Sequence, residues 1–127
     1  TYAKMIHGNR PLKFRMPITF NGNFVEWFYW GFIDGDFITP HDKYRTCPSF
    51  QYTGFNDKYG KEIYEGDVIC FWQYYYVPSY VGERELITKI VQCDSSGEWN
   101  VSRWIRHDIE VIDNIYETPE RLNETTR

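Results

Sequence analysis

The chain has 127 residues, the size of a single domain with one core. Aromatic residues make up 20% of it and alanine occurs only once, at Ala3, so the composition favours β-sheet over a helical bundle. The formal net charge of −4 disfavours duplex nucleic acid as the main partner, because duplex binders gain affinity by neutralising phosphates with Lys and Arg. We therefore expect a mainly β fold with little helix.

The first predicted elements form a meander in the N-terminal third. Lys13–Arg15 alternates polar and apolar residues, and Pro17 is expected to stop this short strand. The turn signal Asn21-Gly22-Asn23 precedes an aromatic strand over Phe24–Ile33. An Asp34-Gly35-Asp36 turn then leads into a return strand at Phe37–Thr39, because Asp-Gly suits a tight hairpin.

Three further strands are expected in the middle of the chain. Two are short, at Ser49–Thr53 and Glu62–Tyr64, while Val68–Val77 is the longest β-type run. Both faces of the long run are apolar or aromatic. This pattern predicts a strand covered on each side, or one bent around a barrel.

The C-terminal part predicts a hairpin and a closing strand. Leu86–Cys93 and Glu98–Ile105 alternate around an Asp94–Gly97 turn, which indicates an antiparallel pair. Ile109–Tyr116 is expected to be the last strand, followed by a helical turn from Thr118-Pro119 through Leu122. Many short strands with frequent turns are typical of a small barrel or sandwich.

Polar clusters in the sequence give no catalytic, metal or cofactor constellation. Glu62, Glu65 and Asp67 could bind a cation or act as acid and base, but we favour solvated turn charges, because Lys58 and Lys61 flank them. The three histidines are too scattered for a metal triad, and no glycine-rich phosphate loop opens a helix. We therefore expect no enzyme activity and no cofactor.

The cysteines and the apolar runs indicate where in the cell the protein is located. Cys47, Cys70 and Cys93 are odd in number and lack a C-x-x-C pair, so we expect inert thiols in a reducing cytosol. No stretch approaches the about 20 apolar residues of a membrane span, and no basic-then-apolar leader opens the chain. We expect a cytoplasmic protein without a membrane partner.

The best candidate binding surface is aromatic. Trp72, Tyr74 and Tyr76 share one face of the Val68–Val77 strand. These rings could belong to the core, which we favour, or form a protein interface, or stack single-stranded bases or a sugar. The aromatic strand from Trp27 to Trp30 allows the same alternatives, and exposure of both strands would favour self-association.

One stretch, Gln51–Asp67, combines three glycines with Asp and Asn between short apolar islands, which is typical of tight turns. Gln51–Gly54, Asp57-Lys58 and Gly60–Val68 resemble the signature of the YopX family of small phage and prophage proteins. Lys13–Arg15 is similar to the opening of family members, and Ile109–Leu122 to their closing strand and turn.

The resemblance implies an SH3-like barrel over residues 49–127, preceded by an N-terminal β-rich extension over residues 1–48. It also implies a phage or prophage origin, and it supplies no catalytic residues. We predict a non-enzymatic accessory protein in the bacterial host cell that acts through protein binding or as a homo-oligomer. The alternative is single-stranded nucleic-acid binding by Trp72, Tyr74 and Tyr76.

Overall fold

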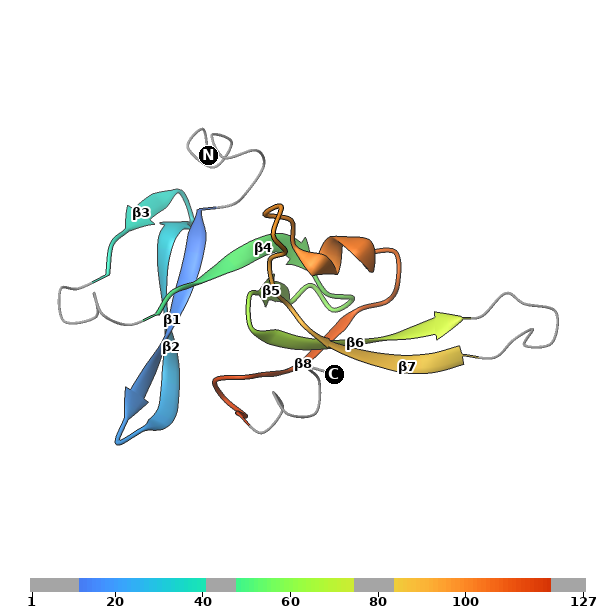
Figure 1. Ribbon diagram of the computed structural model, residues 1–127. Helices are drawn as coiled ribbons and strands as arrows, with labels where there is room; N and C mark the ends of the chain where they lie inside the picture. The colour runs from blue at the N-terminus through green and yellow to red at the C-terminus, as the bar shows by residue number, and fades with distance from the viewer. Residues whose placement is uncertain (1–11, 41–47, 75–83, 120–127) are drawn as a thin grey trace.

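The computed structural model describes residues 12–40, 48–74 and 84–119, and these residues form two antiparallel sheets (Figure 1). The first sheet has the order β3-β2-β1-β4-β5, and the second has the order β7-β6-β8. The strands are β1 (Lys13–Phe20), β2 (Asn23–Ile33), β3 (Asp36–Ile38), β4 (Phe50–Asn56), β5 (Glu62–Tyr64), β6 (Asp67–Tyr74), β7 (Arg84–Ile90) and β8 (Glu110–Asn114). A single-turn 3-10 helix, η4 (Asn100–Arg103), precedes β8.

The prediction of a mainly β fold is confirmed. The described strands leave both sheets open rather than closed into a barrel, so the SH3-like barrel implied by the resemblance is not confirmed. None of the helices in the described ranges is long and apolar enough to cross a membrane. The helical turn predicted through Leu122 falls mostly outside the described residues.

Two predicted hairpin turns are confirmed by their backbone conformations. Asn21 and Gly22 both have positive φ, at 52° and 79°, and Asp34 and Gly35 repeat this at 51° and 89°. Positive φ at both central positions is the geometry of a two-residue hairpin turn whose twist matches the flanking strands. These local signals fix the β1-β2-β3 meander.

Pro17 does not stop the first strand, contrary to the sequence prediction. β1 continues to Phe20, and Pro17 lies opposite Trp27 of β2. On its other side, β1 pairs with β4 only at Phe14 and Arg15. Pro17 therefore lies where β1 has one neighbour, a position at which a residue without an N–H is tolerated.

The predicted strand Glu98–Ile105 is wrong, and η4 occupies its place. Only the Cys93–Trp99 bridge remains of the expected hairpin. The Asn100 side chain donates to the Ile90 carbonyl (2.8 Å) and accepts from the Gln92 N–H (3.0 Å), and the Ser102 hydroxyl donates to the Trp99 carbonyl (2.8 Å). Such side-chain-to-backbone bonds compete with a strand ladder, and here they favour the helical turn.

The main core lies between the second sheet, β5 and η4. The central strand β6 contributes Ile69 and Phe71, and Ile63 and Tyr64 of β5 are fully buried. The apolar cluster consists of Ile63, Ile69, Phe71, Val91, Trp99, Val101, Ile109 and Val111. Phe55, Ile87 and Trp104 pack against its border.

β4 belongs to the sheet of the N-terminal hairpin. It pairs with β1 at Phe14 and Arg15, and with β5 at Tyr52 and Asn56. Hydrogen-bonded pairing thus crosses residue 48, the predicted end of the N-terminal extension. The division of the chain into residues 1–48 and 49–127 stays a prediction.

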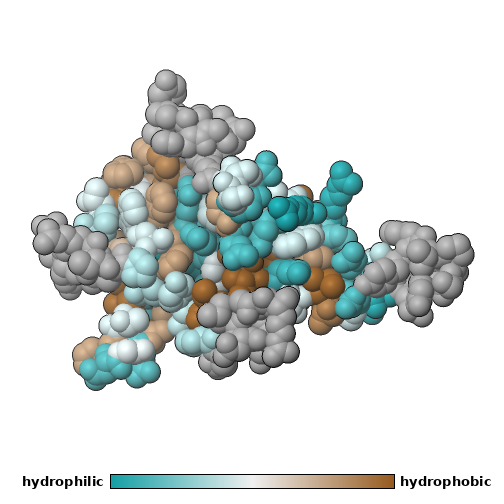
Figure 2. Space-filling model, viewed as in Figure 1, coloured by the Kyte–Doolittle hydropathy of each residue, from teal (hydrophilic) through white to brown (hydrophobic). Residues whose placement is uncertain are grey.

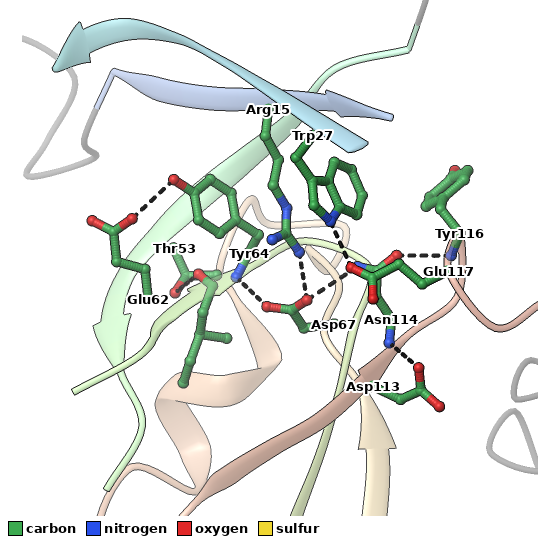
Figure 3. Close-up of polar contacts among 11 residues, drawn as sticks. Arg15, Trp27, Thr53, Glu62, Tyr64, Asp67, Asp113, Asn114, Tyr116 and Glu117 are labelled. Carbon is green, nitrogen blue, oxygen red and sulfur yellow. Dashed lines mark hydrogen bonds and ion pairs between the residues drawn. The ribbon is translucent and has the colours of Figure 1, made fainter. Parts of the chain in front are cut away.

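A buried ion pair joins the two sheets. The guanidinium of Arg15 in β1 donates to the carboxylate of Asp67 at the start of β6, with a separation of 2.5 Å (Figure 3). The guanidinium lies 4.0 Å from the ring of Trp27 and 4.2 Å from that of Tyr64. Asp67 also accepts from the Tyr64 N–H (2.8 Å) and the Asn114 amide (3.0 Å). Asp67 is therefore an anchor between sheets, and its interpretation as a solvated turn charge is wrong.

A second carboxylate clips the 57–61 turn to the last strand. Asp57 accepts the N–H groups of Tyr59 and Lys61 at 2.9 Å each, and that of Val111 at 3.0 Å. Burial opposes ionisation, but these three donors and the nearby Lys61 charge outweigh it. The pKa of Asp57 is therefore below its ordinary value.

Replacing Arg15 with Met is expected to lower the free energy of unfolding by about 3–5 kcal/mol, because Asp67 would stay buried without its cation. Combining Arg15→Met with Asp67→Asn is expected to cost less, since no buried charge then remains unpaired. Urea denaturation followed by circular dichroism measures both losses.

The matched control is Lys13→Met, which removes the more exposed Lys13–Glu62 ion pair (2.8 Å). Its expected loss is at most about 1 kcal/mol, as for most solvent-accessible ion pairs. Equal losses for Arg15→Met and Lys13→Met would contradict the anchoring role of Arg15.

Asp57→Asn is expected to lower the free energy of unfolding at pH 7 by about 1–3 kcal/mol, because one N–H donor loses its acceptor. Since the folded-state pKa is lowered, the stability from ionised Asp57 is present above the unfolded pKa of about 3.9 and is lost as pH falls through the folded value. The variant should therefore lose less stability than the wild type below about pH 4. Thermal melts from pH 2 to 7, with exposed Asp108→Asn as control, test this; parallel curves for wild type and Asp57→Asn would refute it.

Candidate binding surface

The far end of the β6–β7 hairpin exposes large side chains. Trp72 lies opposite Leu86, and Tyr74 lies opposite Arg84. Trp72, Tyr74 and Leu86 are 42%, 48% and 51% exposed. Figure 1 shows this end of β6 and β7 extending away from the rest of the fold, and Figure 2 shows hydrophobic side chains on the same side of the molecule. We call these four residues the aromatic hairpin surface.

Alternation along β6 places these residues on the outer side. Trp72 and Tyr74 share a face, while Phe71 points the other way and is only 2% exposed. Phe71 stacks on Trp104, with ring centroids 5.5 Å apart, and on His107, at 4.8 Å. One face of β6 is thus closed by the segment around η4, and the other stays open at this end.

Arg84 completes the surface by lying against Trp72. Its guanidinium is 4.0 Å from the indole ring, a separation typical of a cation–π contact. The contact holds a positive charge beside the exposed rings and orients the indole across the strand pair. The surface is therefore apolar with a cationic border.

The structure describes two of the three sequence-predicted site residues. It brings Trp72 and Tyr74 together on the exposed end of β6, whereas Tyr76 lies outside the described residues. The favoured interpretation is that one face of the strand is core and the other is covered. Val68 and Ile69 are indeed fully buried, but Trp72 and Tyr74 are exposed.

Sequence reasoning missed Arg84 and Leu86. Both come from β7, and pairing of β7 with β6 places them beside the rings. The available signal was the alternation of Leu86, Thr88 and Ile90, which marks the face they share once the hairpin register is known.

The two tryptophans of the second aromatic strand, β2, make contacts within the fold, whereas Val25 and Tyr29 of the same strand are exposed. Trp27 packs on Arg15 and donates from its indole N–H to Glu117 (2.6 Å) (Figure 3). Trp30 stacks on Phe14, with centroids 4.4 Å apart, and donates to the Ser49 hydroxyl (3.0 Å). These two tryptophans stabilise the first sheet and are half-buried.

A groove of about 680 Å³ lies where the end of β7 meets the turn before β6 and the segment after β8. Its charged lining is balanced, with Lys89 and Arg103 against Glu65 and Asp94. Arg103 contacts Asp94 at 3.1 Å. The Ser96 hydroxyl and the Glu98 N–H lower the pKa of Asp94, so this carboxylate is ionised and held by its own turn. The groove therefore has no net preference for an anion or a cation.

Tyr64, Asp67 and Cys70 also have shifted pKa values, and burial within the fold is the main cause for each. Burial raises the pKa of Tyr64, with the Glu62 charge and hydrogen bond adding to the effect. Burial raises the pKa of Asp67 against the opposing effect of Arg15. The pKa of Cys70 is also raised by burial and by Glu110, which makes this thiol less reactive. In the part of the chain that the structure describes, no three His, Cys, Asp or Glu side chains are grouped to hold a metal ion.

Comparison with known protein families matches residues 33–123 to the model described as YopX protein. The match covers most of the chain, from the end of β2 past β8. The chain belongs to the YopX protein family. No curated protein matches it. The suspected family is thus confirmed, and the aromatic hairpin surface lies within the matched residues.

Proposed function

We propose that this YopX-family chain is a non-enzymatic accessory protein of a phage or prophage that acts through protein binding at the aromatic hairpin surface. Self-association is the most direct form of such binding. The phage or prophage origin and the host-cell cytoplasm rest on the family resemblance. An SH3-like arrangement of the C-terminal part belongs to the same proposal, supported by one core shared among β5, η4 and the β7-β6-β8 sheet.

The observation that carries the proposal is the exposure of two rings and a leucine side by side on paired strands. Tryptophan, tyrosine and arginine are the side chains that contribute most to protein interfaces. Contiguous apolar patches on a soluble protein commonly mark interaction sites. The half-buried tryptophans of β2 have partners within the fold, so they compete less well as a docking surface.

The proposal that the protein is not an enzyme is supported by the contacts of Asp57 and Asp67, two buried carboxylates with shifted pKa values. Asp57 is held by three backbone N–H groups, and Asp67 by Arg15, Tyr64 and Asn114. Both carboxylates connect elements of the fold, and these structural contacts account for their burial. Neither lies among the residues that line the groove.

The wild-type chain is expected to show a mass above 15.4 kDa that rises with concentration in sedimentation velocity experiments. Trp72→Ala should raise the dissociation constant by about tenfold, since truncating an interface aromatic commonly costs more than about 1 kcal/mol. Tyr59→Ala is the control, because this tyrosine is 73% exposed on a turn outside the surface. A wild type that stays monomeric throughout removes self-association, and equal effects of both variants remove the surface.

Single-stranded nucleic-acid binding is the second candidate, favoured by the Arg84 guanidinium beside Trp72. A ring and a cation together match the base and the phosphate of a strand. Labelled oligonucleotides titrated at low salt should bind if this function is correct, and Trp72→Ala should weaken binding by about tenfold, as for loss of one stacked base. Tyr59→Ala should leave binding unchanged. The absence of binding at low salt, where electrostatic attraction is strongest, would eliminate this candidate.

A further inference from the structure

β7 is an outer strand, and no described strand pairs with its outer hydrogen-bonding edge. It stands last in the β7-β6-β8 sheet, and Figure 1 shows it along the border of that sheet. The backbone of Val91, just after β7, bonds towards the β6 side: its N–H donates to Asp67 (2.8 Å) and its carbonyl accepts from Gly66 (2.9 Å). In an antiparallel ladder such residues alternate with residues whose N–H and C=O point outward. Arg84, Leu86 and Thr88 therefore present their backbone groups outward.

The outward direction is confirmed at the end of β7. There the Asn100 side chain bonds to the Ile90 carbonyl and the Gln92 N–H, and the Asn100 N–H donates to the Gln92 carbonyl (3.0 Å). Asn100 thus closes the edge from Ile90 onward. The stretch from Arg84 to Thr88 lies before this closure.

The other outer strands in the described residues are short or closed. β3 and β5 have three residues each. Beside β8, the Asp57 carboxylate accepts the Val111 N–H, and the Lys58 N–H donates to the Ile109 carbonyl at 2.8 Å. Among the described strands that stand last in their sheet, β7 is therefore the longest with an open edge. Such an edge is a template for a further strand.

We infer that the partner of the aromatic hairpin surface is a second copy of this chain, which pairs antiparallel along β7 with its twofold axis at Ile87. This inference rests on the proposed function and specifies its geometry. The contact is isologous, with the same strand contributed by both copies. It would join two three-stranded sheets into one continuous sheet.

Charge complementarity permits this register. With Ile87 opposite Ile87 of the second copy, Glu85 lies opposite Lys89 of the second copy, and the reverse pair forms by symmetry. Opposite charges directly across two strands stabilise pairing, whereas like charges destabilise it. A shift by two residues removes the Glu85–Lys89 pairs. Centred on Thr88 it places Lys89 opposite Ile87 and Glu85 opposite Val91, and centred on Leu86 it places Glu85 opposite Ile87 and Lys89 level with Glu83 of the sequence.

Hydrogen-bonding parity agrees with the same register. Leu86 falls opposite Thr88 of the second copy, and both residues have outward-facing backbone groups. Hydrogen-bonded pairs in an antiparallel ladder exchange both N–H···O bonds between such residues. A shift by one residue would set outward-facing groups against inward-facing ones. The charge pattern and the backbone direction thus independently permit the arrangement centred on Ile87.

The arrangement also extends the aromatic hairpin surface. Leu86 lies beside Trp72 within one chain and beside Thr88 of the second copy across the new edge. The two Leu86 side chains become diagonal neighbours on the same face. The exposed apolar residues of both copies therefore form one band across the joined sheet. Charges on outer strands often prevent edge pairing. Here Glu85 of each copy faces Lys89 of the other copy, so the charges attract.

The test reverses one charge at a time. Glu85→Lys should set two positive charges opposite each other across the contact, and Lys89→Glu should set two negative charges there. Each variant alone is therefore expected to dissociate about tenfold or more readily. An equimolar mixture of the two variants should recover assembly, because a dimer of unlike chains has opposite charges in both facing pairs. The repulsion that each variant meets in its own copies is then absent.

Sedimentation velocity gives the masses, and circular dichroism shows that each variant is folded. Glu98→Lys, at an exposed residue outside β7, carries the same charge change as Glu85→Lys and serves as the control. The double variant Glu85→Lys with Lys89→Glu restores both charge pairs in reversed order within every dimer. It is expected to assemble as the wild type does.

Recovery of assembly in the double variant, with no loss in Glu98→Lys, supports the β7–β7 contact. Weakening by Trp72→Ala without weakening by Glu85→Lys overturns this contact and leaves the proposed surface standing. Failure of the double variant to recover, although it is folded, also overturns the contact, because the two charges would then not face each other. A wild type that is monomeric at every concentration, or that binds only an unlike protein, overturns the inference as well.

Discussion

The ion pair between Arg15 and Asp67 connects the two sheets of this fold. Arg15 belongs to β1 and Asp67 to the first position of β6, 52 residues further along the chain. Two aromatic rings enclose the guanidinium, and Asn114 of β8 holds the same carboxylate. One polar contact therefore fixes the N-terminal hairpin, the central strand and the closing strand relative to one another. Asp67 is the last residue of Gln51–Asp67, so this stretch joins the two sheets in addition to forming turns.

Local signals made part of the fold predictable. The turns at Asn21-Gly22 and Asp34-Gly35 need positive φ, which glycine and Asn or Asp adopt readily, so their sequence was sufficient. The buried state of Asp67 depends on Arg15, and no local pattern links residues so far apart. The helical turn η4 likewise depends on Asn100 finding the carbonyl of Ile90, which requires β7 to be in place. Tertiary contacts therefore determine both the burial of Asp67 and the formation of η4.

The candidate site was also predictable only in part. Alternation along β6 correctly placed Trp72 and Tyr74 on one face. Which part of that face is covered depends on surrounding segments, since Val68 at one end is buried and Tyr74 at the other is exposed. The contribution of Leu86 and Arg84 required the β6–β7 register. A strand pattern therefore specifies which residues share a face, and the packing of distant segments specifies where that face stays open.

The open edge and the exposed rings occur together because the same packing produces both. The segment around η4 covers Phe71 on one face of the β6–β7 hairpin, and Asn100 closes the edge only from Ile90 onward. Beyond that point neither the outer face nor the outer edge receives a covering segment from the described residues. A hairpin left open on face and edge gains most from a partner that adds a strand, since backbone bonds and apolar contacts then form together. The self-complementary charges of Glu85 and Lys89 make a second copy the partner that best satisfies both.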